Sequence, residues 1–128
     1  MHLGAVGRDG DWLLDRLVAL GVARDSIVRL SCASGHAIIT VAAYGENAIT
    51  LFSGANTAMS EAQLTQWLAP IGVGDWLVMQ NETAHQLHAA RMARAQAARV
   101  VYSAAPFEAK AVAEVLPFVN ILCRMNMR

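Results

Sequence analysis

The segment from Gly45 to Asn56 constrains the fold of this chain more than any other stretch of its sequence. Gly45 permits the positive φ that a tight hairpin turn needs, and Asn47 tolerates such a backbone next best. The run before this turn, residues 37–43, is apolar and β-branched at its centre. We therefore predict a β-hairpin over about residues 36–53. Because helical patterns flank it, this hairpin is an appendage to an α/β chain, and its position suits a flap over a site.

The composition excludes several classes of protein. With 128 residues, the chain suits one domain over residues 1–128, long enough to bury a core. Ten Lys and Arg balance ten Asp and Glu, so the charge gives no reason to expect a nucleic-acid or membrane partner. No apolar run approaches the roughly 18 residues of a membrane span, and the N-terminus lacks the features of a signal peptide. We therefore expect a cytoplasmic protein in which Cys32 and Cys123 are free thiols.

Helical and strand patterns alternate along the rest of the sequence. Apolar spacing predicts a helix from Asp11 to Leu20, and capping-box spacing predicts another that opens at Ser60. An Ala-rich stretch that Asn81 or Thr83 can cap predicts a third helix. The remaining predicted elements are a helix over 108–116 and strands at 27–30, 76–79, 100–102 and 119–123. Because these strands are nearly continuously apolar, they favour an α/β fold with a parallel sheet that is covered on both faces.

Six short motifs carry a resemblance to a known family. They are Val6–Asp11, Gly35–Ile39, Gly45–Asn47, Gly54–Asn56, Met79–Glu82 and Ser103–Pro106. In their order and spacing, the chain resembles the middle of a ribokinase, within the PfkB family of carbohydrate kinases. The resemblance implies part of a three-layer αβα, Rossmann-like fold with a small β-hairpin lid over the sugar. It also implies transfer of the γ-phosphoryl group of Mg-ATP to a hydroxyl of a pentose-like sugar.

The same resemblance suggests three site residues. Glu82 matches the family's glutamate that accepts hydrogen bonds from sugar hydroxyls, and the alternative is an acidic residue favoured by the dipole of the helix that follows. Leu51 matches an apolar lid position that closes over the sugar, and the alternative is packing within the hairpin. Asn126 matches an asparagine on the nucleotide side of the family site. Ser103 departs from the ribokinase Asn-Pro-Ala-Pro pattern, so the identity of the sugar stays open.

Two parts of the family's site have no counterpart in the sequence. Family members carry an early Asp and a Gly-Gly segment that grip the sugar, and we expect both to precede the start of this chain. They also carry a Gly-Ala-Gly-Asp signature that supplies an anion hole and the catalytic base, and this signature does not occur here. The resemblance covers roughly the middle two-fifths of a kinase of ordinary α/β size. We therefore predict no catalytic residue and no nucleotide bound by this chain alone.

Two functions stay open on these grounds. The first is a fragment of an ATP-dependent sugar kinase that does not act as an enzyme by itself. The second is a non-catalytic α/β module that binds a partner chain or a carbohydrate. In either case, uncovered apolar sheet faces favour association. We expect a homodimer or self-association through the hairpin at residues 36–53.

The remaining reactive side chains have simpler interpretations. His85 and His88 lie one helical turn apart, but no third ligand has a recognisable spacing, and His36 lies far from both. We therefore predict no metal site and place these two imidazoles on a solvated helix face. Cys32 and Cys123 have no adjacent cation that would lower a thiol pKa, so we expect buried apolar residues.

Overall fold

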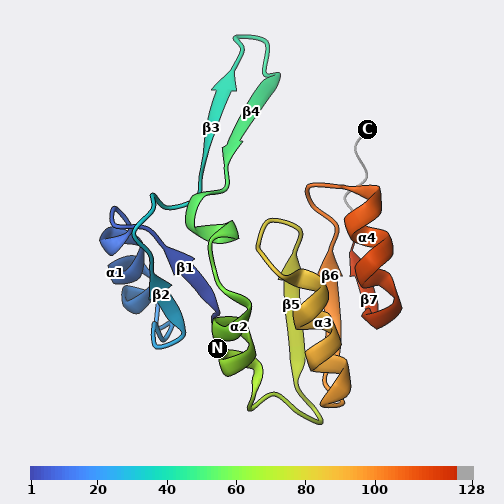
Figure 1. Cartoon of the computed structure of the whole chain (residues 1–128). Helices are drawn as coiled ribbons and strands as arrows, with labels where there is room; N and C mark the ends of the chain where they lie inside the picture. Colours follow the sequence, from blue (N-terminus) through green and yellow to red (C-terminus); the bar gives the residue numbers. More distant parts are fainter. Residues whose placement is uncertain (124–128) are drawn as a thin grey trace. The chain divides into compact units, whose positions relative to one another are not determined.

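The computed structural model describes residues 1–123, and Figure 1 draws them as a coloured ribbon. These residues fall into two units, Met1–Met59 and a second unit that begins at Ser60. The first unit contains two two-stranded sheets and one α-helix, and the second contains a three-stranded sheet with three α-helices among its described residues. The single domain over 1–128 stays a prediction. Among the described residues, no helix has both the length and the apolar character that crossing a membrane requires.

The first unit opens with a strand that the sequence pattern does not predict. Strand β1 (Gly4–Val6) pairs in parallel with β2 (Ile27–Arg29), and helix α1 (Asp11–Ala19) connects them. β1 is only three residues long and begins with glycine, so it lacks the apolar run by which a strand is recognised. Helix α1 ends close to the predicted position and buries Leu14.

The predicted hairpin is confirmed. Strands β3 (His36–Val41) and β4 (Asn47–Phe52) pair antiparallel, with His36 opposite Phe52 and Val41 opposite Asn47. Gly45 has a φ of 91° in the connecting turn, as a tight turn requires. Every residue of both strands is exposed, and the hairpin projects from the rest of the first unit (Figure 1). A 3-10 turn, η1 (Gly54–Thr57), follows β4.

The second unit alternates helices with strands, as the sequence predicts. Its strands are paired in parallel in the order β5-β6-β7. Helix α2 begins as expected, because the Gln63 backbone N–H donates to Ser60 Oγ at 3.2 Å. The elements are α2 (Glu61–Leu68), β5 (Trp76–Gln80), α3 (Gln86–Ala95), β6 (Arg99–Ser103), α4 (Ala109–Val115), η2 (Leu116–Phe118) and β7 (Ile121–Cys123).

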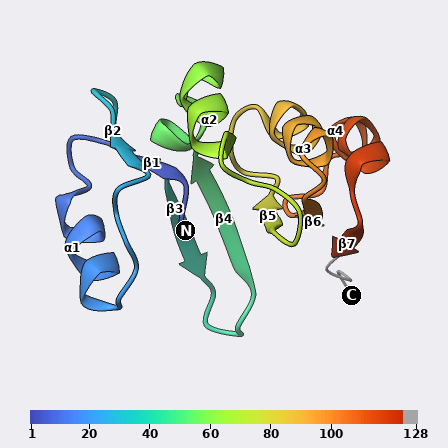
Figure 2. The same ribbon diagram turned by 90° about the horizontal axis from the view of Figure 1, so that it is seen from below.

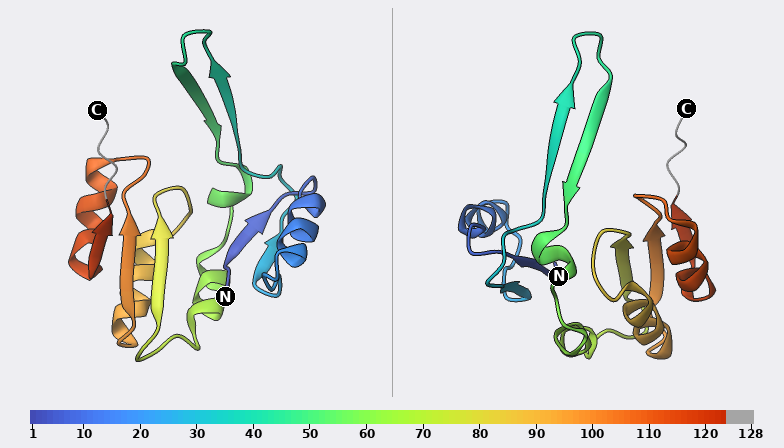
Figure 3. Two further views of the ribbon diagram at one scale, coloured as in Figure 1. Left: turned by 180° about the vertical axis from the view of Figure 1, so that it is seen from behind. Right: turned by 45° about the horizontal axis from the view of Figure 1, so that its top comes forward.

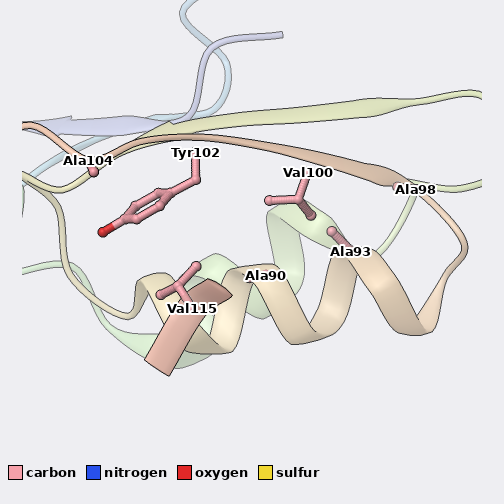
Figure 4. Packing of buried hydrophobic residues seen from close by; sticks show 7 residues of the cluster. All are labelled: Ala90, Ala93, Ala98, Val100, Tyr102, Ala104 and Val115. Carbon is pink, nitrogen blue, oxygen red and sulfur yellow. The ribbon is translucent and has the colours of Figure 1, made fainter. Parts of the chain in front are cut away.

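The core of the second unit lies between β6 and its helices. Val100 and Tyr102 point from β6 toward α3 and α4, where small alanines let the helix approach the sheet closely (Figure 4). Tyr102 is fully buried, and its hydroxyl has no hydrogen-bond partner among the residues that the structure describes. Burial, with Glu108 nearby, raises the pKa of Tyr102.

Within the second unit, only one face of this sheet is covered. Helices α3 and α4 lie on the same side of β5–β7 (Figure 2), and the opposite side is open in the view from behind (Figure 3). Trp76 and Val78 lie on that open side, with Val78 71% exposed. The prediction that the 76–79 strand is buried is therefore wrong, because no helix of this unit packs over its outer face.

Two further local predictions are wrong. Neither Asn81 nor Thr83 caps the Ala-rich helix; the residue that precedes α3 is His85, which has a left-handed backbone with φ of 56°. Five residues separate the end of β5 from the start of α3, so the helix begins later in the sequence than predicted. Cys123 is exposed and not buried, because its register opposite Ser103 places it on the open side of the sheet.

Candidate functional site

The candidate site lies where the parallel strands of the second unit end. Ligands of open α/β sheets bind at the carboxyl ends of the strands, and here two loops follow β5 and β6 at that edge. Asn81 joins them: its backbone N–H donates to the Ser103 carbonyl at 3.2 Å, and its Nδ2 donates to the Pro106 carbonyl at 2.8 Å. The loop that carries Glu82 is therefore fixed against the loop after β6.

Glu82 presents an exposed carboxylate at this edge. Its backbone N–H donates to the Gln80 carbonyl at 2.8 Å, and the Gln80 Nε2 donates to its Oε2 at 3.2 Å. The tight turn and the amide together orient the carboxylate without burying it. A carboxylate held in this way can accept hydrogen bonds from hydroxyl groups of a ligand.

Gln86, at the first position of α3, hydrogen-bonds to the same loop through its side chain. Its Nε2 donates to the carbonyl of Gln80 and, at 3.3 Å, to the carbonyl of Thr83. The side chain also reaches Thr83 Oγ1 at 3.2 Å. One amide group therefore connects Gln80 and Thr83, the residues on either side of the segment that carries Glu82.

The other predicted site residues lie elsewhere. Leu51 lies on β4 of the first unit, opposite Ala37 of β3, with 54% of its surface exposed. Glu82 and Leu51 belong to different units, and each is placed only within its own. Asn126 lies outside the described residues.

The two histidines contact α2, and only His88 departs from the predicted solvated face, since His85 is exposed and His88 is half-buried. His85 and His88 approach the Glu61 carboxylate with their Nδ1 atoms at 3.6 Å and 3.3 Å. His88 Nε2 also lies 2.8 Å from Thr65 Oγ1. These contacts join the first turns of α2 and α3. Within residues 1–123, no group of three or more His, Cys, Asp or Glu has an arrangement that could hold a metal ion.

A polar cluster in the first unit escaped the sequence analysis. Ser34 is only 7% exposed and is the one buried polar residue among those described. Its backbone N–H and its Oγ donate to Asp9 Oδ1 at 2.8 Å and 2.9 Å, and Ser34 Oγ accepts from the Gly7 N–H at 2.8 Å. These hydrogen bonds from Ser34 lower the pKa of Asp9 below its ordinary 3.8. The two residues are 25 positions apart, so no local pattern could indicate the contact.

One segment has the Gly-x-Gly-Asp spacing of the family's catalytic signature, and the sequence analysis did not assign it. It is Gly72–Asp75, in the turn between α2 and β5. Asp75 Oδ2 accepts from the Gly72 backbone N–H at 2.9 Å, and a strand follows. An anion hole for phosphate needs a helix N-terminus after the glycines. This segment therefore does not fit a nucleotide site, and it lies at the opposite end of β5 from Glu82.

Comparison with known proteins identifies ribokinases. No family model and no curated protein matches the chain. Among solved structures, ribokinase from Giardia lamblia matches at a TM-score of 0.81 with 27% identity, over 95% of this chain and 39% of that one. Ribokinase from Cryptococcus neoformans var. grubii serotype A, solved with ADP, matches at 0.75 with 26% identity, over 94% and 38%.

A third match shows the shared fold alone. Ribokinase from Arabidopsis thaliana, solved with ribose and ATP, matches at a TM-score of 0.72 with 21% identity, over 95% of this chain and 42% of that one. The predicted resemblance and the α/β fold class are thus confirmed. The chain spans about two-fifths of the length of each of these kinases.

Proposed function

We propose that this chain forms the sugar-facing part of an ATP-dependent sugar kinase of the ribokinase type. The observation that carries the proposal is the match to Giardia lamblia ribokinase over 95% of the chain, at a level of identity above that of a shared fold alone. The hairpin with Gly45–Asn47 and the loop after β5 with Met79–Glu82 carry two of the motifs on which the resemblance rests.

In the proposed function, Glu82 accepts hydrogen bonds from hydroxyl groups of a pentose. Its exposed carboxylate at the ends of the strands supports this role, as do the hydrogen bonds that join Glu82 to Gln80. Leu51 supplies an apolar contact from the hairpin. The reaction itself needs a base for the sugar hydroxyl and donors for the phosphoryl oxygens. The Gly-Ala-Gly-Asp segment that supplies them in the family does not occur in this sequence, so we expect no turnover by the chain alone.

The second candidate is a non-catalytic module that binds a partner chain. The open side of the β5–β7 sheet favours it, because Trp76, Val78 and Ile121 all lie exposed there. Self-association of two copies through the hairpin is compatible with this candidate and with the kinase proposal, so it does not distinguish the two.

A chimera tests the proposal. Residues 4–123 replace the matching segment of Giardia lamblia ribokinase, and phosphorylation of ribose is measured with Mg-ATP. We expect the chimera to be active and the isolated chain to be inactive. In the chimera, Glu82→Gln should lower kcat/KM for ribose by about tenfold to hundredfold, since a hydrogen bond to a charged group contributes about 1.5–3 kcal/mol.

Glu114→Gln is the matched control, because Glu114 is an exposed carboxylate on α4, away from the strand ends. It should leave kcat/KM unchanged. A folded chimera that phosphorylates no sugar would contradict the kinase proposal and favour the partner-binding module. Turnover by the isolated chain that Glu82→Gln abolishes would overturn the expectation of inactivity.

A further inference from the structure

The base of the hairpin is built from three segments of the first unit. Strand β3 begins two residues after Ser34, and β4 ends just before Ser53 and the turn η1. The Ala55 backbone N–H donates to the Ala33 carbonyl at 3.0 Å, which ties the two ends of the hairpin together. The third segment is the loop after β1, which supplies Asp9.

The backbone at the base of the hairpin is packed so closely that two positions have no room for a Cβ atom. A Cβ on Gly35 would lie 2.7 Å from both the Ser53 carbonyl and the Asn56 amide, and a Cβ on Gly54 would lie 2.5 Å from the Ala33 carbonyl. Gly54 also has a positive φ of 46°. Glycine is therefore required where the two ends of the hairpin pass each other. A backbone packed this closely can hold a defined direction when a side chain locks it.

Asp9 supplies that lock. Its Oδ1 accepts both the backbone N–H and the hydroxyl of Ser34, and the Ser34 hydroxyl in turn accepts from the Gly7 N–H. One carboxylate oxygen thus fixes the residue from which β3 departs. His36 continues the chain of contacts, with its Nδ1 3.1 Å from the Ser34 carbonyl and its ring 5.0 Å from that of Phe52 on β4.

We propose that Asp9 is a positioning residue that sets the direction in which the β3–β4 hairpin leaves the first unit. It acts through its two hydrogen bonds with Ser34. The inference about direction rests only on the geometry of the hairpin base. Its consequence for a sugar, which is where Leu51 is presented, rests on the proposed function.

Two other charged side chains near this base, Arg8 and Asp11, have partners other than Asp9 and Ser34. Arg8 donates from its guanidinium to the Ser31 carbonyl, and Asp11 pairs with Arg29. His36 also lies near Asp9 and, after the hydrogen bonds from Ser34, adds a smaller contribution that lowers the pKa of Asp9. Asp9 is the one carboxylate among the described residues that hydrogen-bonds to Ser34, so Asp9→Ala removes both of these bonds together.

Distance measurements between two spin labels test the proposal on the full chain. Nitroxides are attached at Arg16→Cys on α1 and Glu46→Cys in the hairpin turn, in a background of Cys32→Ala and Cys123→Ala. We expect a narrow distance distribution, which Asp9→Ala broadens at least twofold. Asp9→Asn should preserve it, because the amide oxygen can still accept both bonds from Ser34. Asp15→Ala, which removes an exposed carboxylate of α1, is the matched control and should change nothing.

A double substitution separates the contact from general destabilisation. Ser34→Ala removes the bond from the Ser34 hydroxyl to Asp9 but keeps the bond from the Ser34 backbone N–H, so it should broaden the distribution less than Asp9→Ala does. In the Asp9→Ala background, Ser34→Ala should add less broadening than it causes alone, since its bond to Asp9 is already lost. Hydrogen exchange in β1 and α1 should stay at its original rate. An unchanged distribution in Asp9→Ala overturns the proposal. So does a broadening that comes with lost protection in α1, because Asp9 would then support the whole unit. None of these outcomes depends on sugar binding or phosphorylation.

Discussion

The hairpin of the first unit and strand β6 of the second are made of the same kinds of residues but have opposite environments. β3 and β4 carry Ile, Val and Leu side chains that are exposed along their full length. In β6, Val100 and Tyr102 are fully buried beneath α3 and α4. The strand-forming residues are alike, so the difference comes from the cover that the neighbouring sequence supplies.

This contrast indicates that the packed second unit carries the stability, whereas the hairpin offers a surface for recognition. The second unit contains a packed core of its own, so its free energy of unfolding depends on side chains such as Leu68 and Val100. A two-stranded hairpin without a packed face is marginally stable by itself. Its apolar side, which carries Ile39, Ile49 and Leu51, is therefore available to another surface.

One substitution made in both units gives the largest expected difference. Leu68 on α2 is 1% exposed, and Leu51 on β4 is 54% exposed. We expect Leu68→Ala to lower the free energy of unfolding of the second unit by about 3 kcal/mol, because it leaves a cavity. Leu51→Ala should lower the stability of its unit by about 0.5 kcal/mol or less. Hydrogen exchange measures both, and equal losses would show that the hairpin leucine is packed in solution.

The self-association predicted for the hairpin can be tested on its two sides. Ile39 lies on the side shared with Ile49 and Leu51, and Ile38 lies on the other side, opposite Thr50. If the apolar side forms the contact, Ile39→Lys should raise the Kd of self-association at least tenfold, since burying one such side chain contributes about 1.5–3 kcal/mol. Ile38→Lys should change it little. Sedimentation velocity gives both values, and a strictly monomeric wild-type chain would contradict the prediction.

A smaller effect is expected at the buried hydroxyl of Tyr102. Removing a buried hydroxyl that has no partner among the described residues should be favourable, so Tyr102→Phe should raise the stability of the second unit by about 1 kcal/mol at pH 7. Tyr44→Phe is the control, because Tyr44 is 79% exposed. A loss of stability in Tyr102→Phe would reveal a hydrogen bond to the hydroxyl in solution.

The same tyrosine gives a pH dependence with a definite sign. Its pKa is raised in the folded chain above the ordinary 10.0, so above pH 10 the unfolded chain loses this proton first. The ionisation of Tyr102 therefore leaves the free energy of unfolding unchanged below pH 10 and lowers it as the pH rises through the folded pKa. Urea denaturation between pH 8 and 11 should show this fall in the wild type, and Tyr102→Phe should reduce it.

Much of the local structure could be predicted from the sequence, because it depends on neighbours along the chain. Gly45 sets the hairpin turn, Ser60 caps α2, and apolar runs mark β5 and β6. The carboxylate of Glu82 could be placed at the end of a strand for the same reason. β1 was missed because three residues that begin with glycine carry too little pattern. The contact of His88 with Glu61 was missed because it joins two helices.

By itself, then, the sequence determined the order of the helices and strands from α1 onward, the hairpin and the resemblance to ribokinases. Only the tertiary structure decided which side of the β5–β7 sheet is covered and that Asp9 holds Ser34 across 25 positions. The physical reason is the range of the interactions. Turns and caps are set by residues a few positions apart, whereas burial and the Asp9 contact depend on segments that meet only when the chain has folded.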